Sequence, residues 1–407
     1  MPSRRLDSLY PWLIVAASLI LLTMAQGALY LLSVSLKPIA EEFDWPRKVP
    51  SLAYGLASFF AGLGSIYMAQ LSERIGLGPI ALFGTCMISL GAVATSFVEE
   101  WWQLYLIYGL LIGLLGNSCV FSPIIANTTR WFERRRGLAI GIVGCGQSLA
   151  GVVWPQIVPL VNGSMGWRTT YLWYGLACFA LMLPAALVVR RRPPAPKNAA
   201  AAGGDGDGLV LGWKPGVVMA TLNVAIIGCC IAMALPITHL VAYGTDLGHL
   251  ETEAASLVSM MLGFSMISRL GGGLLADRIG GLRTVFLGSA IQAAMLFVMA
   301  FTESLPGLLL VSAVFGIGYG GIIPIYAIAV RDHFPLAGAA RRIAVLYFFG
   351  LFAMALGSWF GGWMFDQTGS YRPAFVLGSL ANFGNLLLLG VLIWRAYGPR
   401  ARRLATT

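Results

Sequence analysis

The feature that most constrains this chain is a series of twelve apolar runs, each long enough to cross a membrane as a helix. A hydrocarbon core about 30 Å thick needs about 20 helical residues. Charges, prolines or glycine clusters bound the runs, which lie at 11–36, 49–71, 78–97, 102–125, 137–160, 169–189, 215–243, 254–276, 284–301, 306–330, 341–364 and 373–394. We therefore expect an all-α membrane protein with twelve transmembrane helices.

The composition excludes the main classes of soluble protein. Only 11% of the 407 residues are charged and 58% are hydrophobic, whereas a soluble domain carries about 25% charged residues. The six cysteines lack the spacing of a disulfide framework or a zinc site, and no Walker A, GxSxG or HExxH motif occurs. We expect no cofactor, no metal and no enzymatic activity.

The basic residues fix the expected orientation. When the spans are threaded alternately through a membrane, 21 of the 27 lysines and arginines fall on one side and five on the other. This asymmetry predicts that both termini are cytoplasmic in a multi-pass protein of the cell (inner) membrane. It also explains the net charge of +10 without a nucleic acid. The expected partners are the bilayer, a small substrate and a proton, with no obligate protein partner.

The chain also contains an internal repeat. Glu73-Arg74-Ile75-Gly76 follows the second span, and Asp277-Arg278-Ile279-Gly280 follows the eighth at an offset of 204 residues. Trp167-Arg168 matches Tyr371-Arg372 at the same offset. The stretch 191–214 has the composition of a flexible linker. We therefore predict two six-helix bundles, 1–190 and 215–407, in the pseudo-symmetric arrangement typical of secondary transporters.

One basic residue remains inside a span. Arg269 lies 16 residues from Glu253 and eight from Asp277, or about 24 Å and 12 Å along a helix. Its helical neighbours are mostly small, so we expect it to face the bundle, where no carboxylate of the spans could pair with it. A substrate carboxylate, gripped by two hydrogen bonds, is one interpretation. Snorkelling to the cytoplasmic surface is the other.

Other polar and aromatic residues form a second group of candidates. Asn117 bonds either a neighbouring helix or a substrate, and Tyr319, Tyr347 and Phe348 either shape a pocket or pack as ordinary aromatic residues. The run Gly316-Ile317-Gly318-Tyr319-Gly320-Gly321 fits GxGxxG, but it lies inside a span with no strand before it. That context favours close helix packing over nucleotide binding.

Several longer motifs resemble a known family. GGGLLADRIGGLR (271–283) is similar to the loop signature of the major facilitator superfamily. HLVAYGTDLG (239–248), RWFERRRGLAIGI (130–142) and GGWMFDQTGSYRPAF (361–375) resemble the monocarboxylate porter family, including its oxalate–formate-antiporter-like relatives. The resemblance implies the twelve-helix fold and makes Arg269 the anchor of the substrate carboxylate.

The resemblance also suggests roles for the remaining candidates. Many animal members have an Asp one turn before this Arg, and Ser265 stands there instead, so proton coupling needs another group. His239 and Asp246 are the candidates. The alternatives are an interfacial histidine for His239 and a solvated loop carboxylate or helix cap for Asp246. His239 is also a candidate for substrate binding, and a proton carried by the substrate is a third route. Four charged residues are expected to gate the cytoplasmic side, or only to set topology: Glu73, Arg74, Asp277 and Arg278.

The expected function is secondary active transport of a small monocarboxylate such as lactate or pyruvate, by proton symport and alternating access. The alternatives are a carboxylate antiporter of the oxalate–formate type and a transport-inactive carboxylate sensor on the same fold. A drug exporter is disfavoured because the spans contain no acidic residue.

Overall fold

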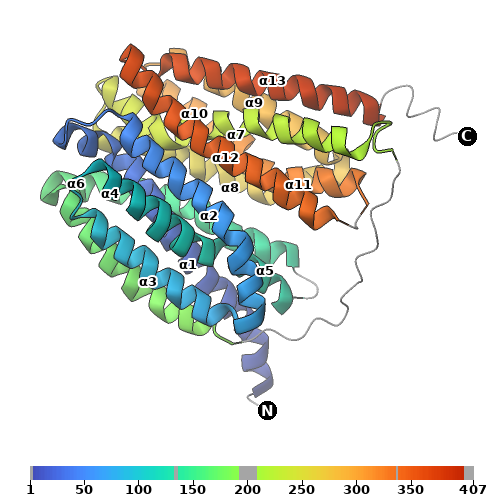
Figure 1. Cartoon of the computed structure of the whole chain (residues 1–407), viewed down its shortest axis with the longest axis horizontal. Coiled ribbons are helices and arrows are strands. Elements are labelled where there is room, and N and C mark those ends of the chain that lie inside the picture. Colours follow the sequence, from blue (N-terminus) through green and yellow to red (C-terminus); the bar gives the residue numbers. More distant parts are fainter. Residues whose placement is uncertain (1–2, 133–135, 192–208, 336–337, 398–407) are drawn as a thin grey trace, which may run out of the picture. The chain divides into compact units, whose positions relative to one another are not determined.

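The computed structural model describes residues 3–132, 136–191, 209–335 and 338–397, and long helices make up nearly all of them (Figure 1). In this part of the chain, 11 helical segments are long and apolar enough to cross a membrane. One of them, Ala139–Val188, has 50 residues and is divided at Gly166, whose φ of 79° and ψ of 159° are not helical. With that division, helical segments match all twelve predicted spans.

The helices follow one another with short connections. The first group consists of α1 (Ser3–Glu42), α2 (Lys48–Ile75), α3 (Leu77–Thr95), α4 (Trp101–Leu106), the π-helix η1 (Ile107–Asn117), α5 (Ser118–Trp131) and α6 (Arg136–Val188). The second group consists of α7 (Pro215–Asp246), α8 (Glu251–Ile279), α9 (Gly281–Phe301), α10 (Leu305–Tyr319), α11 (Ile322–His333), α12 (Ala339–Thr368) and α13 (Arg372–Tyr397).

The described residues form two compact units. The first falls within Met1–Ala199 and also includes Thr238–Ser259, which is the last part of α7 and the first part of α8. The second consists of Ile237 and the residues before it in α7, together with Met260 onward. Most of the predicted linker 191–214 lies outside the described residues. The division into bundles 1–190 and 215–407 stays a prediction.

The repeat seen in the sequence recurs in the backbone. Gly76 ends α2 with φ 93° and ψ 160°, and Gly280 ends α8 with φ 88° and ψ 154°. A side chain is strained at such angles, so glycine is needed at both positions. The second repeat motif also behaves alike in the two units, because Arg168 and Arg372 each form an ion pair with a glutamate, Glu42 and Glu303 respectively.

Two predicted spans are not the continuous α-helices that were expected. In span 102–125, the 11 residues of η1 form a π-helix, and its glycines pack closely: a Cβ on Gly113 would lie 2.7 Å from the Ala57 carbonyl oxygen of α2. In span 306–330, the helix stops at Tyr319 and restarts at Ile322. The predicted span is nevertheless a single membrane-crossing candidate, because Leu305–His333 is 29 residues long and apolar enough to cross a membrane, and Gly320 and Gly321 between its two parts keep right-handed helical angles.

Candidate functional site

Arg269 lies in the middle of α8 and belongs to the second unit. Its side chain is partly buried, and its Nε is fully buried with no hydrogen-bond partner among the described residues. Its guanidinium carbon is 6.0 Å from the centre of the Tyr319 ring. No carboxylate in the described part of the chain forms an ion pair with it. Since a buried charge is costly unless paired, this cation is available to an anionic ligand.

The interruption between α10 and α11 lies against α8 beside Arg269. A Cβ on Gly320 would be 2.0 Å from the carbonyl oxygen of Ser265, and one on Gly321 would be 2.7 Å from that of Ser268. Only glycine lets the two backbones approach this closely. The prediction that the Gly316–Gly321 run serves helix packing is therefore confirmed, although the helix is broken where the packing is closest.

The three aromatic candidates lie on two helices and make different contacts. Tyr319 is the last residue of α10, only 8% exposed, and its ring is the one that Arg269 approaches. Tyr347 of α12 donates a hydrogen bond to the carbonyl oxygen of Ile323, 3.3 Å away, in the first turn of α11. Phe348 is 39% exposed and contacts the Phe349 ring. Tyr319, which contacts Arg269, therefore comes just before the break in the chain, and Ile323, which accepts the hydrogen bond of Tyr347, comes just after it.

Two further candidates, Asn117 and His239, belong to the first unit. Asn117 closes η1 and is 5% exposed, and its Nδ2 finds no hydrogen-bond acceptor among the described residues. His239 is fully buried in α7, and its roles in substrate binding and proton coupling stay predictions. Both are polar groups enclosed by apolar helices.

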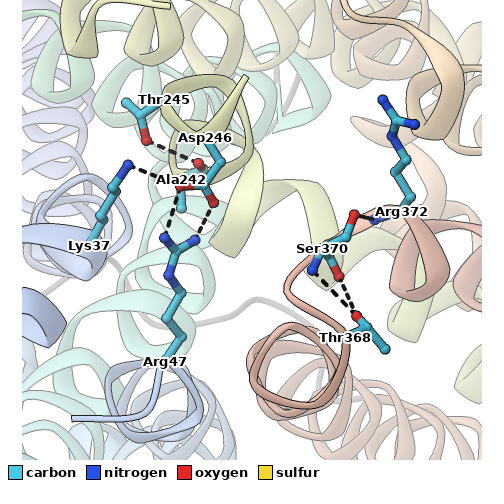
Figure 2. A network of polar contacts seen from close by, with 8 residues as sticks. All are labelled: Lys37, Arg47, Ala242, Thr245, Asp246, Thr368, Ser370 and Arg372. Carbon is cyan, nitrogen blue, oxygen red and sulfur yellow. Dashed lines mark hydrogen bonds and ion pairs between the residues drawn. The ribbon is translucent and has the colours of Figure 1, made fainter. Parts of the chain in front are cut away.

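Asp246 ends α7 and is held by two cations of the first unit. Its Oδ1 accepts hydrogen bonds from Lys37 Nζ at 2.9 Å and from Arg47 Nη2 at 2.8 Å, and its Oδ2 accepts one from Arg47 Nη1 (Figure 2). The Asp246 side chain is 22% exposed. The carboxylate thus ties α1 and the start of α2 to α7, and its role in proton coupling stays a prediction.

Sequence reasoning missed Lys37 and Arg47 as functional candidates and counted them only as charges that set topology. They lie 209 and 199 residues from Asp246 along the chain, so no local motif joins them. The available signal was that they are two of only five basic residues on the side of the membrane that is poor in positive charge.

The proposed gating residues lie at helix ends. Glu73 and Arg74 are in the last turn of α2, and Asp277 and Arg278 are in the last turn of α8. The side chains of Arg74, Asp277 and Arg278 are exposed. This location suits charges that form and break contacts at a surface, and it equally suits charges that only set topology.

Comparison with known proteins identifies the family. The model of the Major Facilitator Superfamily matches residues 17–302 and 220–406. The chain belongs to the major facilitator superfamily. Its relatives include Monocarboxylate transporter 11 of Homo sapiens, which is 28% identical over 95% of this chain and 83% of that protein.

Another relative is MFS-type transporter pynF of Aspergillus niger, 26% identical over 69% of this chain and 63% of the relative, so that match spans less than two thirds of the fungal protein. The crystal structure of a bacterial homologue of the human lysosomal transporter Spinster aligns with a TM-score of 0.67. It covers 95% of this chain and 96% of the other at 16% identity, and it shows the shared fold.

As a member of this superfamily, the chain is a multi-pass membrane transporter and not an enzyme. A half-buried guanidinium beside a tyrosine and a helix break supplies hydrogen-bond donors, which can bind a planar anion.

Proposed function

We propose that this superfamily member transports small monocarboxylates, of the size of lactate or pyruvate, by proton-coupled symport. The observation that carries the proposal is Arg269, a guanidinium in mid-span with a buried, unpartnered Nε. A carboxylate can accept two parallel hydrogen bonds from it and neutralise its charge. The similarity to a monocarboxylate transporter supports the same class of substrate.

Alternating access would expose Arg269 to each side of the membrane in turn. We assign gating to the charged residues at the ends of α2 and α8 and to Asp246, which already links three helices. The proton would travel on His239, since histidine is the side chain that changes charge near neutral pH, or on the substrate itself.

We place the protein in the cell membrane with both termini in the cytoplasm, because 21 basic residues fall on one side of the threaded chain and five on the other. A protease-sensitive tag at either terminus should be cleaved in inside-out vesicles and protected in intact cells. Cleavage in intact cells would reverse the orientation.

The function is tested by uptake of labelled lactate into proteoliposomes, with and without an imposed pH gradient. Proton symport predicts accumulation when the lumen is alkaline and little accumulation without the gradient, and empty liposomes are the control. Uptake that requires a carboxylate inside, and ignores the gradient, would establish antiport instead. Binding without any uptake would establish a sensor.

A further inference from the structure

A groove lies between α9 and α13 in the second unit, where the two helices run side by side (Figure 1). Its volume is about 440 Å³, and apolar and aromatic residues line it: Phe286 of α9, and Leu386, Leu387, Gly390, Val391 and Trp394 of α13. The wall is hollow at Gly390, because the atom nearest to its Cβ position is Phe286 Cε2 at 4.0 Å. We call this feature the α9–α13 groove.

The α9–α13 groove is open to the surroundings of the helices. Leu387 is 75% exposed and Trp394 is 63% exposed, and α9 and α13 are both candidates for crossing a membrane. The surroundings of such helices are the acyl chains of lipids. A chain that lies in the groove contacts both helices, so it gains more dispersion contacts than a chain against the convex surface of one helix.

A cation stands at the end of the groove where α9 begins and α13 ends. Arg283 precedes Phe286 by three residues in α9, and Tyr397 follows Trp394 by three residues in α13, a spacing that places each pair on one helix face. The guanidinium carbon of Arg283 is 3.8 Å from the centre of the Tyr397 ring. Arg283 is exposed, and no carboxylate in the described part of the chain forms an ion pair with it.

The same end of the groove has the residues typical of a membrane surface. Tryptophan and tyrosine are enriched at the level of the lipid head groups, and Trp394 and Tyr397 lie in the last turn of α13. Arg283, in contact with Tyr397, is therefore at the depth of the lipid phosphates. This end lies on the side that we place in the cytoplasm, where the leaflet carries anionic lipids.

We propose that the α9–α13 groove binds an anionic phospholipid, with one acyl chain along the apolar lining and the phosphate group against Arg283. A guanidinium donates charge-assisted hydrogen bonds to a phosphate. A phosphatidylcholine head group also contains a cation, which Arg283 repels, so the site prefers a head group with a net negative charge. The occupant is a lipid and not the transported substrate.

The test uses the full-length protein in detergent, with the dissociation constants of dioleoylphosphatidylglycerol and dioleoylphosphatidylcholine measured by native mass spectrometry. The wild type should bind the anionic lipid about fivefold more tightly, which corresponds to about 1 kcal/mol for one arginine. Arg283→Gln should bind both lipids alike. Arg341→Gln is the matched control and should keep the preference, since Arg341 is also an exposed arginine of the second unit but belongs to α12, which does not line the groove.

A second pair of variants tests the groove itself. Gly390→Leu fills it, whereas Gly390→Ala adds one methyl group and leaves most of it open. We expect Gly390→Leu to bind both lipids about tenfold more weakly, the loss of about two buried methylene groups. Gly390→Ala should stay close to the wild type. Neither Arg283 nor Gly390 is buried, so the melting temperatures should change little.

A fluorescence measurement places the acyl chain. Phosphatidylglycerol with brominated chains should quench Trp394, whose signal is the difference between the wild type and Trp394→Phe. The same difference should be quenched less in the Gly390→Leu background. Absence of Trp394 quenching in the wild type would overturn the proposal.

Equal affinities of the wild type for the two lipids, or an unchanged preference in Arg283→Gln, would also overturn it. Unchanged lipid affinity in Gly390→Leu would do the same, and loss of a dimer in that variant by light scattering would assign the groove to a second copy of the chain. Displacement of the lipid by inorganic phosphate alone would replace the lipid site by a site for a free anion. Each of these results leaves the proposed function standing, because lactate uptake tests it separately.

Discussion

At the scale of single residues, the charge of Arg269 costs free energy because it lies within a membrane span. An arginine at the centre of a membrane span costs about 3 kcal/mol on insertion scales, and no carboxylate of the described chain offsets that cost. A side chain kept only for packing would cost less as leucine. This cost favours a role of Arg269 that needs its charge, above all the binding of a ligand of opposite charge.

Arg269→Ala should lower lactate uptake at least about 100-fold, because two charge-assisted hydrogen bonds are lost. Its melting temperature should stay close to that of the wild type, since no carboxylate of the described chain is left without its cation. Arg269→Lys should recover little, because an ammonium group cannot form the paired, planar contact. Normal uptake by Arg269→Ala would refute the anchor assignment, and failure of the variant to fold would give the arginine a structural role.

At the scale of elements, two kinds of contact hold neighbouring helices together. The α10–α11 break is held against α8 through glycines, and α7 is fastened to α1 and α2 through Asp246. The first contact depends on the absence of side chains and the second on charge. They should therefore respond to different perturbations.

Gly320→Ala should destabilise the protein by about 1–3 kcal/mol, the usual cost of overpacking. The added methyl group would lie 2.0 Å from the Ser265 carbonyl oxygen, which is backbone and cannot turn aside. Gly273→Ala on α8 is the control, because nothing lies within 4 Å of its Cβ position. Thermal unfolding in detergent measures both, and equal melting temperatures would contradict the close contact.

Asp246→Asn should lower the melting temperature at low salt, because Lys37 and Arg47 then lose the carboxylate that accepts hydrogen bonds from both. The loss should be modest, about 1 kcal/mol, since all three side chains are partly exposed. It should shrink in about 1 M sodium chloride, where charges are screened within a few ångströms. Glu41→Gln, an exposed carboxylate of the same region, is the control. A salt-independent loss would show that charge is not the cause.

At the scale of the whole molecule, the distribution of charge along the chain limits the cargo. Arg269 is the only lysine or arginine of the predicted spans that lies away from a span end. Span 341–364 has only Arg341 and Arg342, in the first turn of α12, where Arg341 is exposed and Arg342 lies over the Phe334 ring at 5.2 Å. One guanidinium neutralises one carboxylate.

Oxalate and malonate should therefore compete with labelled lactate at least about tenfold less well than pyruvate or acetate at neutral pH. A second carboxylate without a cation costs several kcal/mol in a low-dielectric site, and each 1.4 kcal/mol is a factor of ten in affinity. Inhibition by oxalate as strong as that by pyruvate would contradict this prediction and favour antiport of dicarboxylates.

The sequence predicted the spans well because hydropathy acts on whole segments. It also predicted the break near Gly166, where charged and polar residues separate two apolar runs. The break at Gly320 could not be seen, since two glycines hardly change the hydropathy of span 306–330. Arg269 was found because a charge stands out in an apolar run. The partners of Asp246 were missed because they are about 200 residues away, and only folding brings them together.

The π-helix η1 has a consequence for changes in chain length. A π-turn closes its hydrogen bond one residue later than an α-turn, so each turn of Ile107–Asn117 holds more residues than the helix needs. Deletion of one residue there can convert a π-turn to an α-turn and leave α4 and α5 in register. The same deletion in α3 would rotate every later residue by about 100°. We therefore expect the chain to tolerate deletion of a single residue in this span.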